Sequence, residues 1–161
     1  AFARTQTPFQ VIHVTGERDH GQVVAALQAE DANRLYQAHA FLDDFPLALA
    51  AADAVVARAG GSVAEVLARG VPSLLVPYPL ATGDHQTNNA RMVVEGAAAL
   101  MIPDAELDGA RLAEAVSTLL DPQMNARMRE AALRLARPDA ADRIADVIVE
   151  LVASSTGRHH D

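Results

Sequence analysis

The chain has 161 residues, enough for one domain with a sizeable core, and half of them are hydrophobic while only 4% are aromatic. Its formal net charge of -8 excludes a broadly basic surface, so we expect no nucleic acid among its partners. The lack of cysteine excludes disulfides, thiolate nucleophiles and sulfur-ligated metal sites. No apolar run approaches the roughly 20 residues that span a bilayer, and the N-terminus has no signal-peptide pattern. We therefore expect a cytoplasmic protein.

Strand-like and helix-like segments alternate along most of the chain. In order, apolar spacing predicts strand 9–15, helix 21–29, strand 36–40, a helix from 43 or 44 to 51, strand 54–57, helix 62–69, strand 73–76, helix 84–95 and strand 98–102. The pattern then changes to helices only, which we predict at residues 108–120, 122–136 and 140–152. Residues 154–161 are polar, and we expect a disordered tail there.

This order of elements predicts an α/β fold with a doubly wound parallel sheet and a helical C-terminal end. We assign residues 1–153 to a single domain. Residues 1–7 resemble the end of a helix whose preceding strand is missing, so we expect this domain to lack its first strand. In such folds ligands bind beyond the carboxyl ends of the strands, and the loops that follow the strands are therefore the places to look for a site.

The loop at residues 58–65 (Arg-Ala-Gly-Gly-Ser-Val-Ala-Glu) joins a predicted strand to a predicted helix. Its two glycines allow a ligand to come close to the backbone, and free amides at a helix start suit an anion. The same residues also fit a capping box, in which Ser62 begins the helix and Glu65 accepts a hydrogen bond from its amide. Taken locally, the cap is the better interpretation, and a ligand role stays open.

A second loop, at residues 77–90, is long and polar, which is uncommon in a compact domain without a functional cause. Its side chains suit sugar hydroxyls, which need both donors and acceptors. The alternative is that Asp84 caps the next helix while the remaining polar groups are solvated.

A third segment, Phe-Leu-Asp-Asp-Phe at residues 41–45, places apolar residues around two carboxylates. It fits either a surface for a flat base or an ordinary helix start with a hydrophobic staple, and local sequence favours the helix start. The six histidines show no metal-ligand spacing, and no Ser/His/Asp arrangement stands out. These residues therefore indicate neither a metal site nor a catalytic triad.

Together these motifs resemble the C-terminal, donor-binding domain of GT-B glycosyltransferases. The residues that carry the resemblance are 41–45, the run Ala-Asp-Ala-Val-Val-Ala-Arg-Ala-Gly-Gly-Ser-Val-Ala-Glu at 52–65, Gly-Val-Pro-Ser-Leu-Leu-Val-Pro at 70–77 and Asp-His-Gln-Thr-Asn-Asn-Ala at 84–90. The similarity is greatest to MurG-like UDP-N-acetylglucosamine transferases of lipid II and peptidoglycan synthesis, and it extends over residues 9–151. It implies a Rossmann-like domain.

The resemblance implies a role for each matching position. Leu42 would offer its backbone to uracil with Phe45 nearby, and Glu65 would accept hydrogen bonds from the ribose hydroxyls. Backbone amides of four residues would lie near the diphosphate: Gly60, Gly61, Ser62 and Val63. Gln86 and the adjoining His85 would face the sugar, and Asn89 would brace their loop. The partner it implies is UDP-N-acetylglucosamine, with no cofactor and no metal.

The chain also departs from the family pattern. Arg58 and Glu65 are one residue closer together than is usual, and His85-Gln86 stands where two glutamines are common. The N-terminal acceptor domain with the catalytic base, and the first phosphate loop of the donor domain, would both precede Ala1. We therefore expect the chain alone to be inactive. The resemblance places the whole enzyme at the inner face of the plasma membrane, where its acceptor is a lipid-linked muramyl-pentapeptide.

Three alternatives stay open at this point. The chain could belong to another UDP-sugar enzyme of the same fold, such as an antibiotic glycosyltransferase or a 2-epimerase. It could be one subunit of a naturally split transferase that docks on a membrane partner. It could also be a non-catalytic nucleotide-binding or interaction domain, for which a change at Glu65 has no effect on function.

Overall fold

The computed structural model describes residues 9–29 and 35–156 and has α/β architecture. Residues 1–7, which we expected to end a helix, and residues 157–161 of the expected tail lie outside the described residues. The elements in chain order are β1 (Val11–Val14), α1 (Glu17–Ala29), β2 (Tyr36–His39), α2 (Phe45–Ala51), β3 (Val55–Ala57), α3 (Val63–Ala68), β4 (Ser73–Leu75), η2 (Thr82–Asp84), α4 (His85–Glu95), β5 (Ala99–Met101), η3 (Asp104–Glu106), α5 (Gly109–Leu120), α6 (Pro122–Leu135) and α7 (Ala140–Thr156).

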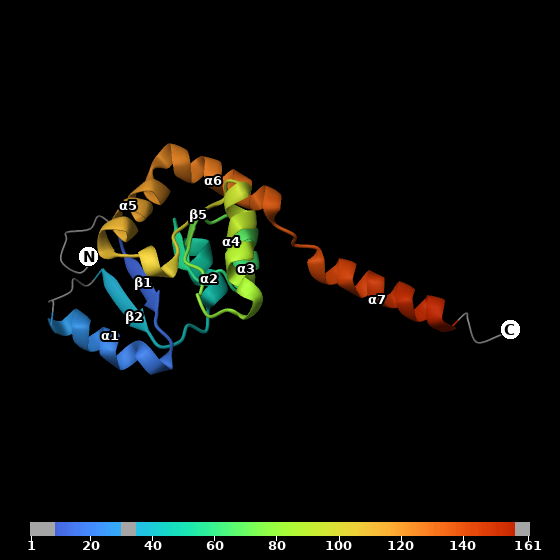
Figure 1. Ribbon diagram of the computed structural model, residues 1–161, viewed down its shortest axis with the longest axis horizontal. Helices are drawn as coiled ribbons and strands as arrows, with labels where there is room; N and C mark the ends of the chain where they lie inside the picture. Colours follow the sequence, from blue (N-terminus) through green and yellow to red (C-terminus); the bar gives the residue numbers. More distant parts are fainter. Residues whose placement is uncertain (1–8, 30–34, 157–161) are drawn as a thin grey trace.

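All strand pairs are parallel, which confirms the predicted fold class, but the described strands form two sheets. β1 pairs with β2, and Val11 lies opposite Tyr36. The second sheet has the order β3-β4-β5, in which Ser73 lies between Val55 and Ala99. Figure 1 shows β1, β2 and α1 on one side of the molecule, beside the second sheet and its helices. We call β1, α1 and β2 the N-terminal unit, and β3–β5 with α3–α6 the central unit.

The central strand β4 is covered on both faces. Side chains alternate along a strand, so neighbouring residues of β4 point to opposite faces of the sheet. Leu74 packs in a cluster with Leu119 and Met128 of α5 and α6. Leu75 packs in another cluster with Val63 of α3 and Val93 of α4. This arrangement explains why the strand reads as an uninterrupted apolar run, as is typical of buried parallel strands.

Helix α6 closes the central unit over two glycines. A Cβ added at Gly96 would come within 2.4 Å of a Leu135 methyl carbon. A Cβ added at Gly70 would lie 2.9 Å from Cγ of Leu133, and Gly70 has a φ of +64°, which favours glycine. Both glycines end helices, so they stop α3 and α4 and also admit α6 closely.

The N-terminal unit is packed much less tightly. Helix α1 has no buried residue, and it begins at Glu17 rather than at residue 21 as predicted. The Gly16 backbone before it has a φ of +75°. Strands β1 and β2 contain only half-buried and exposed residues. The described part of the N-terminal unit therefore has no fully buried core of its own.

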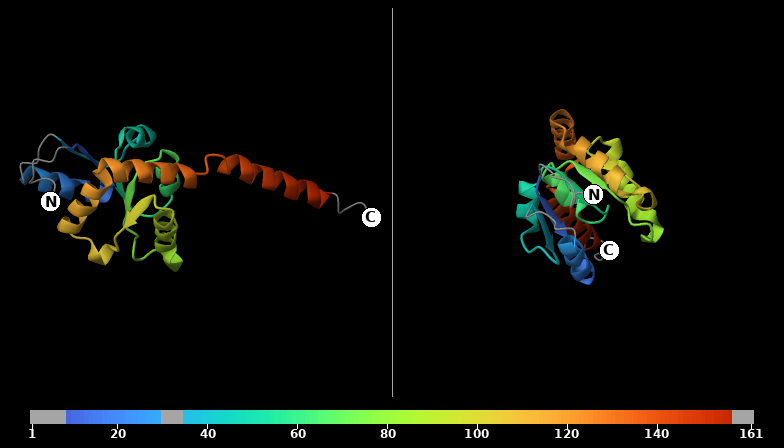
Figure 2. Two further views of the ribbon diagram at one scale, coloured as in Figure 1. Left: turned by 90° about the horizontal axis from the view of Figure 1, so that it is seen from above. Right: turned by 90° about the vertical axis from the view of Figure 1, so that its left-hand side faces the viewer.

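Helix α7 projects away from the other elements, as Figure 1 and the left view in Figure 2 show. It ends at Thr156, three residues into the segment that we predicted to be a tail. The hydroxyl of Ser154 donates to the Leu151 carbonyl at 2.9 Å, a local bond that is compatible with helical backbone. The polar composition of residues 154–156 was therefore a poor guide to where the helix stops.

Candidate functional site

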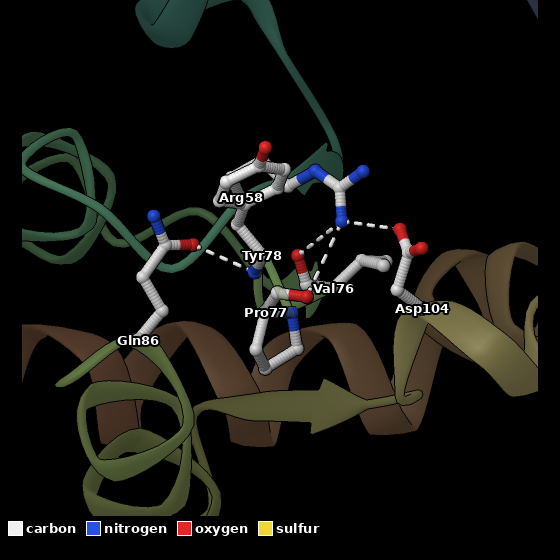
Figure 3. Close-up of polar contacts among 6 residues, drawn as sticks. All are labelled: Arg58, Val76, Pro77, Tyr78, Gln86 and Asp104. Carbon is white, nitrogen blue, oxygen red and sulfur yellow. Dashed lines mark hydrogen bonds and ion pairs between the residues drawn. The ribbon is translucent and has the colours of Figure 1, made fainter. Parts of the chain in front are cut away.

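Three loops that follow β3, β4 and β5 meet at one edge of the second sheet, because the carboxyl ends of parallel strands lie together. Arg58, directly after β3, donates from Nη1 to the carbonyl oxygens of Val76 and Pro77, both at 3.3 Å. The same nitrogen forms an ion pair with Asp104, the first residue of η3 after β5. Figure 3 shows this guanidinium group between the two carbonyls and the carboxylate. The loops after β3, β4 and β5 are therefore in contact at the edge of the sheet where we expect a ligand to bind.

The capping box predicted at the start of α3 is not formed. Ser62 has right-handed helical backbone angles, φ −64° and ψ −12°, and its side chain makes no cap hydrogen bond. A capping residue needs an extended backbone so that its side chain can turn back to the helix amides. The Gly60 carbonyl instead accepts from the Val63 amide at 3.3 Å, which tightens the turn. The locally favoured interpretation of this motif was wrong.

Failure of the cap leaves the Glu65 carboxylate exposed in the first turn of α3. No hydrogen bond or ion pair to it is found in residues 9–29 and 35–156. Within the same residues, the amides of Gly61 and Ser62 also lack an acceptor. The start of α3 therefore presents an acceptor and two donors to solvent, side by side.

Val63, whose amide the resemblance places near the diphosphate, is already engaged within the chain. Its amide is engaged by Gly60, and its side chain lies in the core cluster of α3, α4 and α6. Val63 is therefore a packing residue whose amide is already satisfied. At Gly61, by contrast, an added Cβ would meet no atom within 4 Å, so the space above this loop is open.

The loop between β4 and α4 is held by its own polar groups. The Tyr78 amide donates to Oε1 of Gln86 at 2.9 Å, and Nδ2 of Asn89 donates to the Ala59 carbonyl at 3.1 Å. His85 uses Nδ1 to bond the Thr82 carbonyl at 2.8 Å. The Asn89 bond attaches α4 to Ala59, a buried residue of the loop after β3. It therefore connects the loops at residues 58–65 and 77–90, in which the sequence indicates a site.

Asp84 begins α4, as predicted, but its side chain makes no cap hydrogen bond. Its φ of 53° is left-handed, and it follows Gly83 with a φ of 63°. Aspartate tolerates this conformation better than most residues, and glycine adopts it freely. The backbone turn, and not a side-chain cap, therefore sets the direction in which His85 and Gln86 leave the loop.

Leu42 and Phe45 are half-buried near the start of α2. Phe45 packs against a cluster of Leu49, Val66 and Val71, which joins α2 to α3. Phe45 thus has a packing role and also lies near the helix that carries Glu65. The aspartate before α2, Asp44, makes no side-chain cap.

The sequence interpretation gave no role to Arg58, Tyr78 or Asp104. The Arg58 guanidinium carbon lies 5.6 Å from the centre of the Tyr78 ring, in addition to its bonds to the neighbouring loops. A signal for Arg58 was present, since a cation directly after an apolar strand has to find partners at the sheet edge. The signal for Asp104 was absent, because 46 residues separate the two.

Comparison with known proteins identifies the family of the chain. Residues 1–144 match the Glycosyltransferase family 28 C-terminal domain. The chain belongs to this family. The family membership confirms the resemblance that the loop motifs indicated, and it accounts for the parallel strands with loops that meet at their carboxyl ends.

Individual family 28 relatives add detail. The chain is 40% identical over 154 residues to the Bacillus licheniformis protein named UDP-N-acetylglucosamine--N-acetylmuramyl-(pentapeptide) pyrophosphoryl-undecaprenol N-acetylglucosamine transferase, covering 94% of the chain and 40% of that relative. A protein of the same name from Anaeromyxobacter sp. strain K is 41% identical over 150 residues, covering 92% of the chain and 39% of that relative. The crystal structure of Acinetobacter baumannii MurG superposes with a TM-score of 0.82 at 29% identity, covering 92% of this chain and 45% of that one.

The chain thus spans about 40% of the length of the curated family 28 relatives it matches. Within residues 9–29 and 35–156, no helix is long and apolar enough to cross a membrane. In the same residues, no three His, Cys, Asp or Glu side chains come together as metal ligands.

Proposed function

We propose that this chain is the donor-binding part of a transferase that moves N-acetylglucosamine from UDP-N-acetylglucosamine to a lipid-linked muramyl-pentapeptide. The observation that carries the proposal is the exposed Glu65 carboxylate, which has no partner in the described residues and lies beside the free amides of Gly61 and Ser62. A carboxylate accepts two hydroxyl donors well, as a ribose offers, and free amides suit a diphosphate. The names of the 40% identical relatives support the same donor.

The remaining site residues have roles that fit this donor. Leu42 offers its backbone to the uracil, and Phe45 supports that segment from α2. Gly60 belongs to the diphosphate loop with Gly61 and Ser62. Two further residues, His85 and Gln86, face the sugar from the start of α4, and Asn89 braces their loop through the Ala59 carbonyl.

The rest of the reaction belongs to the longer protein. The attacking hydroxyl needs a base, and the acceptor needs a surface of its own. We assign both to the part of the relatives that this chain does not match, so the chain alone is expected to be inactive. A lipid-linked acceptor places the whole enzyme at the inner face of the plasma membrane.

We also infer that a further strand fits between β1 and β3. Val11 and Thr15 donate their amides toward β2, so the alternating amides of Ile12 and Val14 point to the opposite, open edge of β1. The Val55 amide donates to the Pro72 carbonyl next to β4, so the Val56 amide lies on the open edge of β3 by the same alternation. These three side chains are 44–51% exposed although all are apolar.

A cavity between the amino ends of the two strands supports this inference. Its volume is about 490 Å³, and it is lined by Phe9 before β1 and Asp53 before β3, together with residues of α5 and α6. A strand inserted here would unite both sheets in a single one. Its following loop would reach the diphosphate side and supply the expected first phosphate loop.

The test of the donor site is a titration of the full-length protein with UDP, UDP-N-acetylglucosamine and GDP-mannose, measured by calorimetry. We expect selective binding of the two uridine ligands. Glu65→Gln should weaken both by about 10- to 100-fold, because the carboxamide keeps one acceptor oxygen but loses the equivalent of one charge-assisted hydrogen bond, worth about 1.5–3 kcal/mol. Glu95→Gln, at an exposed carboxylate near the end of α4, is the matched control and should leave both affinities unchanged. Equal binding of GDP-mannose, or an unaffected Glu65→Gln protein, would contradict the proposal.

A further inference from the structure

Arg58 and Gln86 bind the two polar groups of a single peptide unit, the one between Pro77 and Tyr78. The Pro77 carbonyl accepts from Arg58 Nη1 at 3.3 Å, and the next amide, that of Tyr78, donates to Gln86 Oε1 at 2.9 Å. The Pro77 oxygen and the Tyr78 nitrogen belong to one planar peptide unit, and in a trans peptide they point in opposite directions. Figure 3 shows Arg58 and Gln86 on opposite sides of this unit.

The contact also fixes which end of the Gln86 carboxamide faces the site. A backbone amide is only a donor, so Gln86 has to turn its oxygen toward Tyr78. Its Nε2 is then directed away, and it lies 3.9 Å from the position that a Cβ would take at Gly60. The amino group of Gln86 is therefore presented as a donor beside the β3 loop.

Further contacts restrain Arg58 itself. Its Nη1 also bonds the Val76 carbonyl and the Asp104 carboxylate, and its guanidinium group lies near the face of the Tyr78 ring. A guanidinium with several partners in different loops has little freedom to move, and neither has the peptide that it holds. The ion pair with Asp104 thus connects η3 to the orientation of a side chain on α4.

We propose that Arg58 is a positioning residue that orients the Gln86 carboxamide toward the donor sugar and thereby sets the preference for a UDP-sugar over UDP. The inference rests on the proposed function, in which Gln86 faces the sugar. Without Arg58, the Pro77–Tyr78 peptide can rotate, and Gln86 loses its fixed acceptor orientation. The loss of Arg58 therefore weakens the contacts with the sugar and leaves the contacts with the nucleotide unchanged.

The experiment measures Kd for UDP-N-acetylglucosamine and for UDP in the full-length protein by calorimetry. Arg58→Met keeps much of the side chain's apolar volume and removes its donors. We expect a loss of about tenfold for the UDP-sugar, equivalent to about one hydrogen bond, and a change below about twofold for UDP. Arg111→Met is the matched control, because Arg111 is equally exposed and pairs with Glu106 of the same η3 segment without touching the β4 loop. It should change neither value.

A double-substitution cycle separates positioning from general support of the fold. In a Gln86→Ala background, Arg58→Met should have no further effect on the ratio of the two Kd values. Equal losses for UDP and the UDP-sugar together with a lowered melting temperature would overturn the proposal, as would an unchanged ratio in Arg58→Met. If the unsubstituted protein binds neither uridine ligand, the proposed function fails, and the role of Arg58 fails with it.

Discussion

The N-terminal unit and the central unit both alternate strands with helices, but their side chains are buried to different degrees. In the central unit both faces of β4 are covered, and Leu74 and Leu75 are almost wholly inaccessible. In the N-terminal unit no residue of β1, α1 or β2 is fully buried. A two-stranded parallel sheet has no interior strand, so one helix cannot give it a core. Position in the sheet, rather than hydrophobic content, therefore decides how much each strand contributes to stability.

The largest effect that tests this comparison is expected from truncating a leucine in the central unit. Leu74→Ala should lower the free energy of unfolding by about 2–5 kcal/mol, because it leaves a cavity between β4 and α5. Val14→Ala, in the N-terminal unit, should cost less than about 1 kcal/mol because its side chain is already 44% exposed. Urea denaturation of the two variants measures both values. Similar costs would contradict the difference between the units.

Much of the central unit was predictable from sequence because its signals are local. The apolar run of β4 and the glycines at residues 70 and 96 fixed a strand and two helix ends to within a few residues. The order of the loops also indicated which of them meet at the carboxyl edge of the sheet. The Ser62 cap was mispredicted for a local reason too, since the Gly60–Val63 turn competes with the geometry that a cap requires.

Features that depend on tertiary contacts could not be predicted from the sequence. Arg58 and Asp104 meet only because β3, β4 and β5 are adjacent and parallel. The division of the strands between two sheets was also missed, because strand patterns do not specify which edges pair. The resemblance supplied roles for Glu65 and Gln86, but the orientation of the Gln86 amide came from the structure.

The next largest effect is expected in the hydrogen exchange of amides at the unpaired edges of β1 and β3. If a strand of the longer protein fits between β1 and β3, the amides of Ile12, Val14 and Val56 become bonded in a ladder. Their hydrogen exchange should then be slower in the full-length protein than in this chain, on the order of a hundredfold. Leu74, whose strand already has a neighbour on each side, provides the internal control and should change far less. Equal rates in both proteins would rule out the inserted strand.

The smallest effect is a pH dependence in the N-terminal unit. The Tyr36 hydroxyl lies 2.8 Å from Nδ1 of His13, and partial burial lowers the pKa of His13 below its ordinary value of 6.5. In the folded state the ring therefore resists protonation, so the unfolded state binds more protons as the pH falls. The stability contributed by neutral His13 is fully present above about pH 6.5 and is lost as the pH drops toward the folded-state pKa. Because the ring is only half-buried, solvent screens its charge, and the loss should be smaller than the cost of Leu74→Ala. Urea denaturation at about pH 5.5 and about pH 7.5 measures this loss, and His13→Phe should remove the part that the imidazole contributes. If His13→Phe keeps the full difference, the pH dependence arises from other groups, and the His13–Tyr36 contact does not link protonation to the stability of this unit.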